Sequence, residues 1–194
     1  SPLPARLRSG IRGAVTCVVG LEQGGVVYIG ADSAAVSRER LRSRADPKAF
    51  RVGPYVLGFT TSFRMGDVLR YSFAPPEPPS RGLARFMATA FVDAARAAFK
   101  EAGVATNASG VESCGAFLVG VRGRLFTIES DYQVGEERAG FHAVGSGDQV
   151  ALGALFATTR VRDPRVRLRL ALAAAERFTS DVRRPWRIVV GGGR

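Results

Sequence analysis

Short runs of apolar residues, separated by glycine-rich turns, dominate the first part of the chain. Residues 17–21 and 26–31 form two such runs, and the Glu-Gln-Gly-Gly segment between them is typical of a β-hairpin turn. Both runs are apolar at nearly every position, whereas a strand with one face in water would alternate apolar and polar residues. The pattern predicts antiparallel strands in a sheet that is covered on both faces. Two more pairs of runs predict hairpins, at residues 49–52 with 55–60 and at 115–121 with 124–130.

Helical periodicity begins after the second hairpin. Residues 62–72 are compatible with a short helix that ends before the proline cluster at 75–79. From about Ser80 to Gly103, apolar residues recur at three-and-four spacing, which predicts an amphipathic helix. Two C-terminal helices are predicted, one to about Ala157 after a Gly-Ser-Gly-Asp cap and one from Asp163-Pro164 to about Phe178. Residues 141–144 and 186–190 complete the pattern as strands.

Helices and hairpins in this order predict an α+β fold. Hairpins imply antiparallel sheets, and strands apolar on both faces imply that helices cover a pair of sheets from outside, as a four-layer α/β/β/α sandwich. The length of 194 residues favours a single domain, which we assign to residues 16–194. Residues 1–15 contain prolines, glycines and three arginines but no acidic residue. We interpret them as a disordered extension, a cleavable propeptide or sequence upstream of the true start; a mitochondrial-type presequence ranks last.

The composition narrows the classes of function. A net charge of +11 is compatible with nucleic-acid binding, but the arginine clusters at 38–44 and 165–169 have no interleaved aromatic residues for base stacking. We therefore expect no nucleic-acid partner. No apolar stretch approaches the ~20 residues that span a bilayer, so no membrane association is expected. Cys17 and Cys114 are far apart and lack paired metal spacing, which suggests buried thiols in a reducing, cytoplasmic compartment. We expect no metal and no cofactor.

Three residues suggest an amidase site around a threonine hydroxyl. Thr16 opens the first apolar run, Asp32 closes the second, and Lys48 precedes the third, at equal spacings of sixteen residues. Lys48 is one of only two lysines in a chain that takes its other positive charges from arginine. Each residue also has an ordinary structural explanation as the start or end of a strand. Their joint occurrence favours the site.

The motifs around these residues resemble the proteasome β-subunit family, and in particular its simpler bacterial relatives such as HslV. The similarity runs from Thr16 to Val190 and weakens after Gly147. Its motifs are Thr-Cys-Val-Val-Gly at the start, Ile-Gly-Ala-Asp before Ser33, Lys48 at the matching distance, Val-Leu-Gly-Phe around Gly58, and Ala-Val-Gly-Ser-Gly around Ser146.

This resemblance implies an N-terminal-nucleophile hydrolase in which the threonine is both nucleophile and chain terminus. A neutral α-amine, with an ordinary pKa of about 7.7 to 8.0, can accept the hydroxyl proton, whereas a peptide nitrogen cannot. By resemblance, Lys48 lowers the pKa of the amine and hydroxyl, and Asp32 keeps Lys48 charged and oriented. The N–H of Gly58 would stabilise the oxyanion and Ser146 would relay protons. Asp181 is a further catalytic candidate, displaced from the family's aspartate position.

The resemblance also implies partners. The leading hypothesis is a threonine endopeptidase in a ring of identical subunits that degrades peptides or unfolded proteins, with an ATP-dependent unfoldase as a further partner; the chain itself has no P-loop motif. Two alternatives stay open: a non-catalytic scaffold that retains residues 1–15, and an amidohydrolase of small amides. The family's self-processing members carry glycine before the threonine, whereas this chain has Val15.

Overall fold

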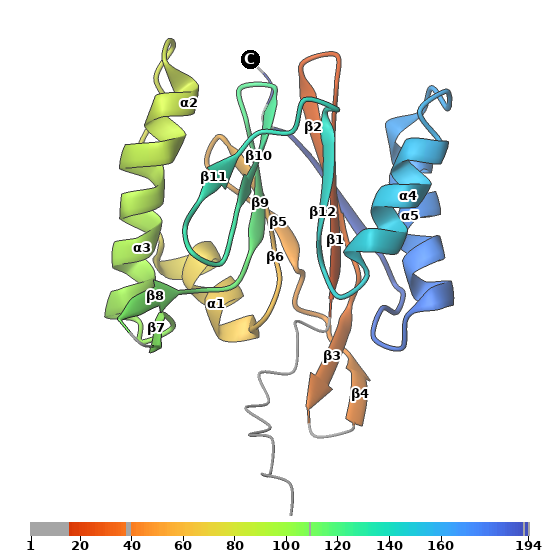
Figure 1. Ribbon diagram of the computed structural model, residues 1–194, viewed down its shortest axis with the longest axis horizontal. Coiled ribbons are helices and arrows are strands. Elements are labelled where there is room, and N and C mark those ends of the chain that lie inside the picture. The colour runs from red at the N-terminus through yellow and green to blue at the C-terminus, as the bar shows by residue number, and fades with distance from the viewer. Residues whose placement is uncertain (1–15, 38–39, 109, 192, 194) are drawn as a thin grey trace, which may run out of the picture.

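The computed structural model describes residues 16–37, 40–108, 110–191 and 193. The predictions for residues 1–15 therefore lie outside the described residues. Two antiparallel sheets pack face to face, and helices cover their outer faces (Figure 1). This arrangement confirms the predicted α+β, four-layer α/β/β/α sandwich.

The first sheet has four strands in the order β12-β1-β2-β13. Its bounds are β1 (Cys17–Gln23), β2 (Val26–Ala31), β12 (Phe141–Gly145) and β13 (Arg187–Gly191). β1 and β2 form the predicted hairpin, and the turn between them has positive φ at Gly24 and Gly25 (63° and 77°). Residues 17–21 are all buried, so both faces of β1 are covered as its composition predicts.

The second sheet has five strands in the order β11-β10-β9-β6-β5. Its bounds are β5 (Ala49–Val52), β6 (Tyr55–Phe59), β9 (Phe117–Val121), β10 (Arg124–Ile128) and β11 (Val134–Gly135). Two small hairpins extend beyond the sheets, formed by β3 (Ala34–Ser37) with β4 (Arg40–Ser43) and by β7 (Thr106–Ala108) with β8 (Val111–Ser113).

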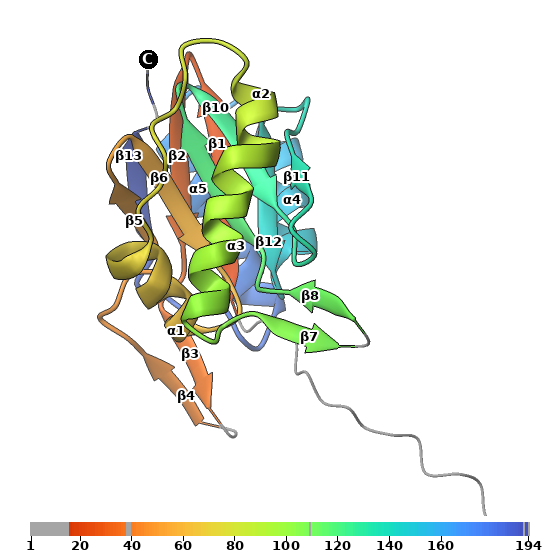
Figure 2. The same cartoon turned by 90° about the vertical axis from the view of Figure 1, so that its left-hand side faces the viewer.

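The helices form the two outer layers, as both views show (Figures 1 and 2). One layer contains α4 (Asp148–Ala157) and α5 (Pro164–Phe178), which pack on the four-stranded sheet. The other contains α1 (Phe63–Asp67), the π-helical η1 (Val68–Ser72), α2 (Leu83–Phe86), the π-helical η2 (Met87–Phe91) and α3 (Val92–Glu101). The predicted helix at 80–103 thus begins at Leu83, after the N-cap Gly82 in a left-handed conformation, and contains a π-helical stretch.

Three layers of buried side chains hold the sandwich together. Val18, Ile29 and Leu118 belong to the layer between the two sheets. A second layer lies under α4 and α5, and an aromatic-rich third layer lies between the five-stranded sheet and the helices from α1 to α3. Because both faces of both sheets are buried, polar side chains inside the sandwich need a specific partner.

Two short hairpins lie in stretches whose composition is not typical of strands. Residues 33–46 and 104–113 are polar, which favours loops, yet each contains a short hairpin. Such hairpins extend beyond the sandwich and therefore lack the apolar runs that mark the core strands. Within the described residues, no helix has the length and apolar character to cross a membrane.

Candidate active site

Thr16, Asp32 and Lys48 meet at one end of the sandwich although sixteen residues separate each from the next. Thr16 directly precedes β1, Asp32 directly follows β2, and Lys48 directly precedes β5. The hairpin of β1 and β2 brings the first two together, and the facing sheet supplies the third. All three are buried, with 2–3% of their surface exposed.

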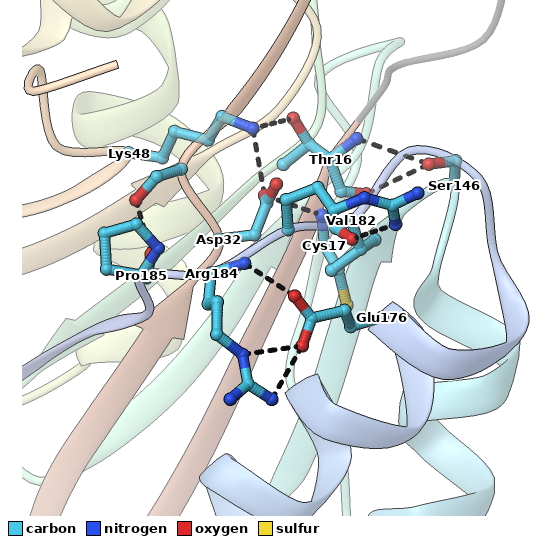
Figure 3. Close-up of polar contacts among 11 residues, drawn as sticks. Thr16, Cys17, Asp32, Lys48, Ser146, Glu176, Val182, Arg184 and Pro185 are labelled. Carbon is cyan, nitrogen blue, oxygen red and sulfur yellow. Dashed lines mark hydrogen bonds and ion pairs between the residues drawn. The ribbon is translucent and has the colours of Figure 1, made fainter. Parts of the chain in front are cut away.

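Lys48 connects the other two side chains. Its Nζ donates to Thr16 Oγ1 at 2.7 Å and to Asp32 Oδ1 at 2.9 Å (Figure 3). The backbone of Lys48 is fixed to β6, because the N–H of Phe59 donates to its carbonyl at 3.0 Å. Burial lowers the pKa of the Lys48 amine, and the Asp32 carboxylate opposes this shift.

Backbone groups orient Asp32 as well. The Cys17 N–H donates to Asp32 Oδ1 at 3.1 Å, and the Asp32 N–H donates to the Cys17 carbonyl at 3.2 Å. The carboxylate therefore accepts from an amide and an ammonium at the same oxygen. This arrangement holds the carboxylate beside Lys48.

Ser146 lies on the other side of Thr16 (Figure 3). The Thr16 N–H donates to Ser146 Oγ at 3.3 Å, and Ser146 Oγ lies equally close to the Thr16 carbonyl, to which it can donate. The alternative interpretation of Ser146 as a helix cap is wrong, because the N-cap of α4 is Gly147 and no side chain caps it. The structure thus places Ser146 next to the nitrogen that would become the α-amine.

Gly145 is a site residue whose importance the sequence analysis missed. Its φ of 107° is unfavourable for residues with a side chain. A Cβ at this position would lie 2.2 Å from the Thr16 carbonyl oxygen. The Gly-Ser-Gly motif was the available signal, but the motif does not reveal that its first glycine packs against the backbone of Thr16.

Gly58 lies deep in the sandwich, in β6 between β5 and β9. Hydrogen-bonded pairs alternate along an antiparallel ladder, so the Thr60 to Ala116 bond implies that the Gly58 N–H points toward Leu118. A Cβ on Gly58 would lie 2.6 Å from Val18 and 2.7 Å from Ile29, which explains the glycine by sheet-to-sheet packing. This geometry speaks against the predicted oxyanion role of Gly58.

Asp181 lies between α5 and β13, next to the fully buried Val182. Its carboxylate accepts a hydrogen bond from the neighbouring Ser180 hydroxyl. The same connecting segment is hydrogen-bonded to the residue after Asp32, since the Ser33 N–H donates to the Arg183 carbonyl at 3.1 Å. A catalytic role for Asp181 stays a prediction.

Comparison with solved structures relates this geometry to known proteins. BPH from Thiobacillus denitrificans, solved alone and in complex with epoxomicin, is 26% identical to this chain, with TM-scores of 0.77 and 0.76. Both matches cover 90% of this chain and 97% of the BPH chain. HslV from Trypanosoma brucei is 20% identical with a TM-score of 0.65, covering 90% of this chain and 98% of its own. Anbu from Hyphomicrobium sp. is 17% identical with a TM-score of 0.63, covering 90% and 80%.

No protein-family model and no curated protein matches the sequence. The two neighbours below a quarter identity carry information about the fold alone. All of these neighbours are nevertheless proteasome-like, and each covers 90% of this chain. The chain therefore has the proteasome-type N-terminal-nucleophile hydrolase fold, and its resemblance to the proteasome β-subunit and HslV family is confirmed.

Proposed function

We propose that the chain is a threonine endopeptidase that uses Thr16 as an N-terminal nucleophile. The observation that carries this proposal is the buried contact of Lys48 Nζ with Thr16 Oγ1 at 2.7 Å and Asp32 Oδ1 at 2.9 Å. A buried ammonium is costly, and here it lies against a hydroxyl that has no need of a charged partner for folding. The contact is explained if Thr16 Oγ1 is a nucleophile, because the ammonium then stabilises the oxygen as it loses its proton.

The chemistry requires a free α-amine on Thr16. Hydrolysis of the bond between Val15 and Thr16 would release residues 1–15 and create this amine. The amine then takes the proton of Thr16 Oγ1, and the oxygen attacks the carbonyl carbon of a substrate peptide bond. The leaving nitrogen receives that proton, and an ester between Thr16 and the acyl part of the substrate is formed. Water hydrolyses the ester and regenerates the hydroxyl.

The neighbouring side chains support each proton transfer. The Lys48 ammonium donates to Thr16 Oγ1, which stabilises the oxygen as it loses its proton. Ser146 Oγ lies 3.3 Å from Thr16 N and can pass the proton between the amine and the leaving group. For the oxyanion, we propose a backbone N–H of Thr61 or Ser62, in the turn that lies near Gly145 beside Thr16. The Thr60 N–H already donates to the Ala116 carbonyl, and the Ser62 N–H would have to leave the Thr60 carbonyl.

We also propose that identical subunits assemble into a ring that encloses the sites, as the resemblance implies. Peptides or unfolded proteins would be the substrates, in the cytoplasm. An ATP-dependent unfoldase would be a separate partner. Size-exclusion chromatography with light scattering tests the assembly, and a monomer at all concentrations would contradict it.

The decisive experiment compares the mature N-terminus with activity. We expect mass spectrometry of active protein to show a chain that begins at Thr16, and fluorogenic peptides to be hydrolysed. Thr16→Ala should abolish hydrolysis, whereas Thr16→Ser, which keeps a hydroxyl, should retain part of it. Circular dichroism of both variants controls for folding. Hydrolysis by protein that still carries residues 1–15 would overturn the mechanism.

A second readout does not depend on turnover. The structure of BPH with epoxomicin suggests this compound as a probe of the site. We expect epoxomicin to raise the melting temperature of the chain that begins at Thr16 and to have no effect on Thr16→Ala. An intact chain with no hydrolysis and no response to epoxomicin would favour the non-catalytic scaffold.

A further inference from the structure

A cavity of about 560 Å³ lies beside the candidate active site. This volume falls within the range of roughly 300–1,000 Å³ that is usual for ligand sites. The walls come from the turn before α1, from α1 itself, from the two segments that flank the β7–β8 hairpin, from the end of β10 and from the end of β12. The lining residues are Thr60, Thr61, Ser62, Met65, Val104, Thr106, Ser113, Cys114, Gly115, Ala116, Ser130 and Gly145.

The cavity borders Thr16 through one lining residue, Gly145, although Thr16 itself does not line it. Gly145 lines it and also packs against the Thr16 carbonyl. A Cβ on Gly145 would also lie 3.4 Å from the side chain of Thr60, a second lining residue. A group held in the cavity would therefore lie close to the backbone of Thr16, and the proposed function places the scissile bond beside that residue.

The lining contains no charged side chain, although the chain has a net charge of +11. Several of its hydroxyls are already used within the protein: Thr60 Oγ1 donates to the Ala116 carbonyl at 2.8 Å, and Thr106 and Ser113 bond each other at 2.8 Å. Cys114 adds a neutral thiol, because burial raises its pKa to about 12. The cavity thus presents mainly methyl groups, a thioether and a thiol.

The wall near the nucleophile is held in an unusual conformation. Thr61 has φ of 76°, which is rare for a β-branched residue, and the Ser62 N–H donates to the Thr60 carbonyl at 3.0 Å. Gly115 faces this turn so closely that a Cβ would lie 2.5 Å from Thr61 Oγ1 and 2.8 Å from Met65 Sδ. Strain of this kind persists only where the surroundings fix it, so the wall is built to a defined shape.

We propose that this cavity binds an uncharged, apolar side chain of the substrate, next to the scissile bond, and rejects aspartate, glutamate, lysine and arginine there. The inference rests on the proposed peptidase function, because it assigns the cavity to that function's substrate. Its physical basis is desolvation. A charged group would lose its hydration and find no counter-charge among the lining residues.

The first test measures binding without turnover. In Thr16→Ala protein that begins at residue 16, N-ethylmaleimide labels Cys114 at alkaline pH, and mass spectrometry follows the rate. Cys17 is fully buried and serves as the internal control that stays unlabelled. We expect capped tripeptides that contain leucine or phenylalanine to slow the labelling roughly tenfold, and matched glutamate or lysine peptides to leave it unchanged. Equal protection by charged peptides, or no protection by any, would overturn the assignment.

The second test changes the wall. Val104 is half-buried and lies outside the proposed proton-transfer groups. Val104→Asp should raise the ratio of kcat/KM for a lysine peptide over a leucine peptide roughly tenfold or more, whereas the isosteric neutral control Val104→Asn should not. If both variants keep the wild-type ratio, the cavity does not contact the substrate. A wild-type chain that hydrolyses no peptide refutes the peptidase instead, and the labelling test then still reports on the cavity.

Discussion

At the level of single residues, Lys48 occupies a position that its burial makes costly. Both Lys48 and Asp32 are 2% exposed, so the pair has lost almost all hydration. Removing two ions from water costs several kcal/mol per ion, and their attraction only roughly compensates for this. Replacing such a pair with apolar residues is often neutral or stabilising. A buried pair that contacts a hydroxyl is therefore better explained by chemistry at Thr16 than by stability.

Stability and activity should therefore respond differently to substitutions of this pair. We expect Lys48→Met to lower the free energy of unfolding by about 3–5 kcal/mol, because it leaves the Asp32 carboxylate buried without its cation. Asp32→Asn keeps an oxygen for the Cys17 N–H but removes the charge. The double variant Lys48→Met/Asp32→Asn should therefore recover most of the unfolding free energy that Lys48→Met loses, measured by urea unfolding, while peptide hydrolysis stays absent. A double variant as unstable as Lys48→Met would show that the uncompensated charge is not the cause.

Gly145 allows a second prediction at this scale. Gly145→Ala forces a side chain into φ of 107° and against the Thr16 carbonyl, so we expect a loss of at least about 1–3 kcal/mol in unfolding free energy and a displaced nucleophile. Gly153→Ala is the matched control, since Gly153 lies in α4 with open space around its Cα. That substitution should stabilise by about 0.5–1 kcal/mol. Equal effects of the two substitutions in urea unfolding would contradict the assignment of Gly145.

At the level of elements, the start of α5 is set by two adjacent residues. Asp163 is the N-cap, and its Oδ1 accepts from the N–H groups of Arg165 at 2.8 Å and Val166 at 3.4 Å. Pro164 occupies the first helical position, where its missing N–H has no cost. Asp163→Ala should therefore destabilise the protein by about 1 kcal/mol, and Asp163→Asn, which can still cap, by much less. Thermal unfolding of both variants checks this, and equal losses would exclude capping as the cause.

The elements show which sequence signals are sufficient. Hairpins with apolar runs and helices with local caps could be predicted, because their signals lie within a few consecutive residues. The hairpins at residues 34–43 and 106–113 could not, since polar strands outside the core resemble loops. The site was predictable where a motif marks it, as at Thr16 and Lys48. The turn at Thr61 and the packing of Gly58 were not, because each depends on a contact with a segment distant in the sequence.

At the level of the whole molecule, Thr16, the proposed nucleophile, lies at the junction of the layers of the sandwich. Cys17 follows Thr16 and faces the layer under α5, where Gly147 and Val182 also pack. Val18, the next residue, faces the layer between the sheets. The chain at Thr16 is therefore anchored by two hydrophobic layers at once. Such anchoring positions a nucleophile without using the polar groups that must act in catalysis.

The same burial makes the fold sensitive to alkali. Burial, and then the nearby Asp32 carboxylate, raise the pKa of the Cys17 thiol from 9.0 to about 12. The folded chain therefore keeps the thiol proton in a range where the unfolded chain releases it, so stability is full below about pH 9 and falls as the pH rises toward 12. The raised pKa of Cys114 lowers stability over the same pH range, whereas the lowered pKa of Lys48 raises stability with pH up to about pH 10.5.

We expect Cys17→Ala to be less stable than the unsubstituted protein at every pH, because it leaves a cavity in the core. Its unfolding free energy should fall less steeply at alkaline pH, by up to about 1.4 kcal/mol per pH unit. Guanidinium unfolding from about pH 8 to about pH 11 measures both slopes, and parallel curves for the two proteins would mean that the thiol ionises equally in the folded and unfolded chain.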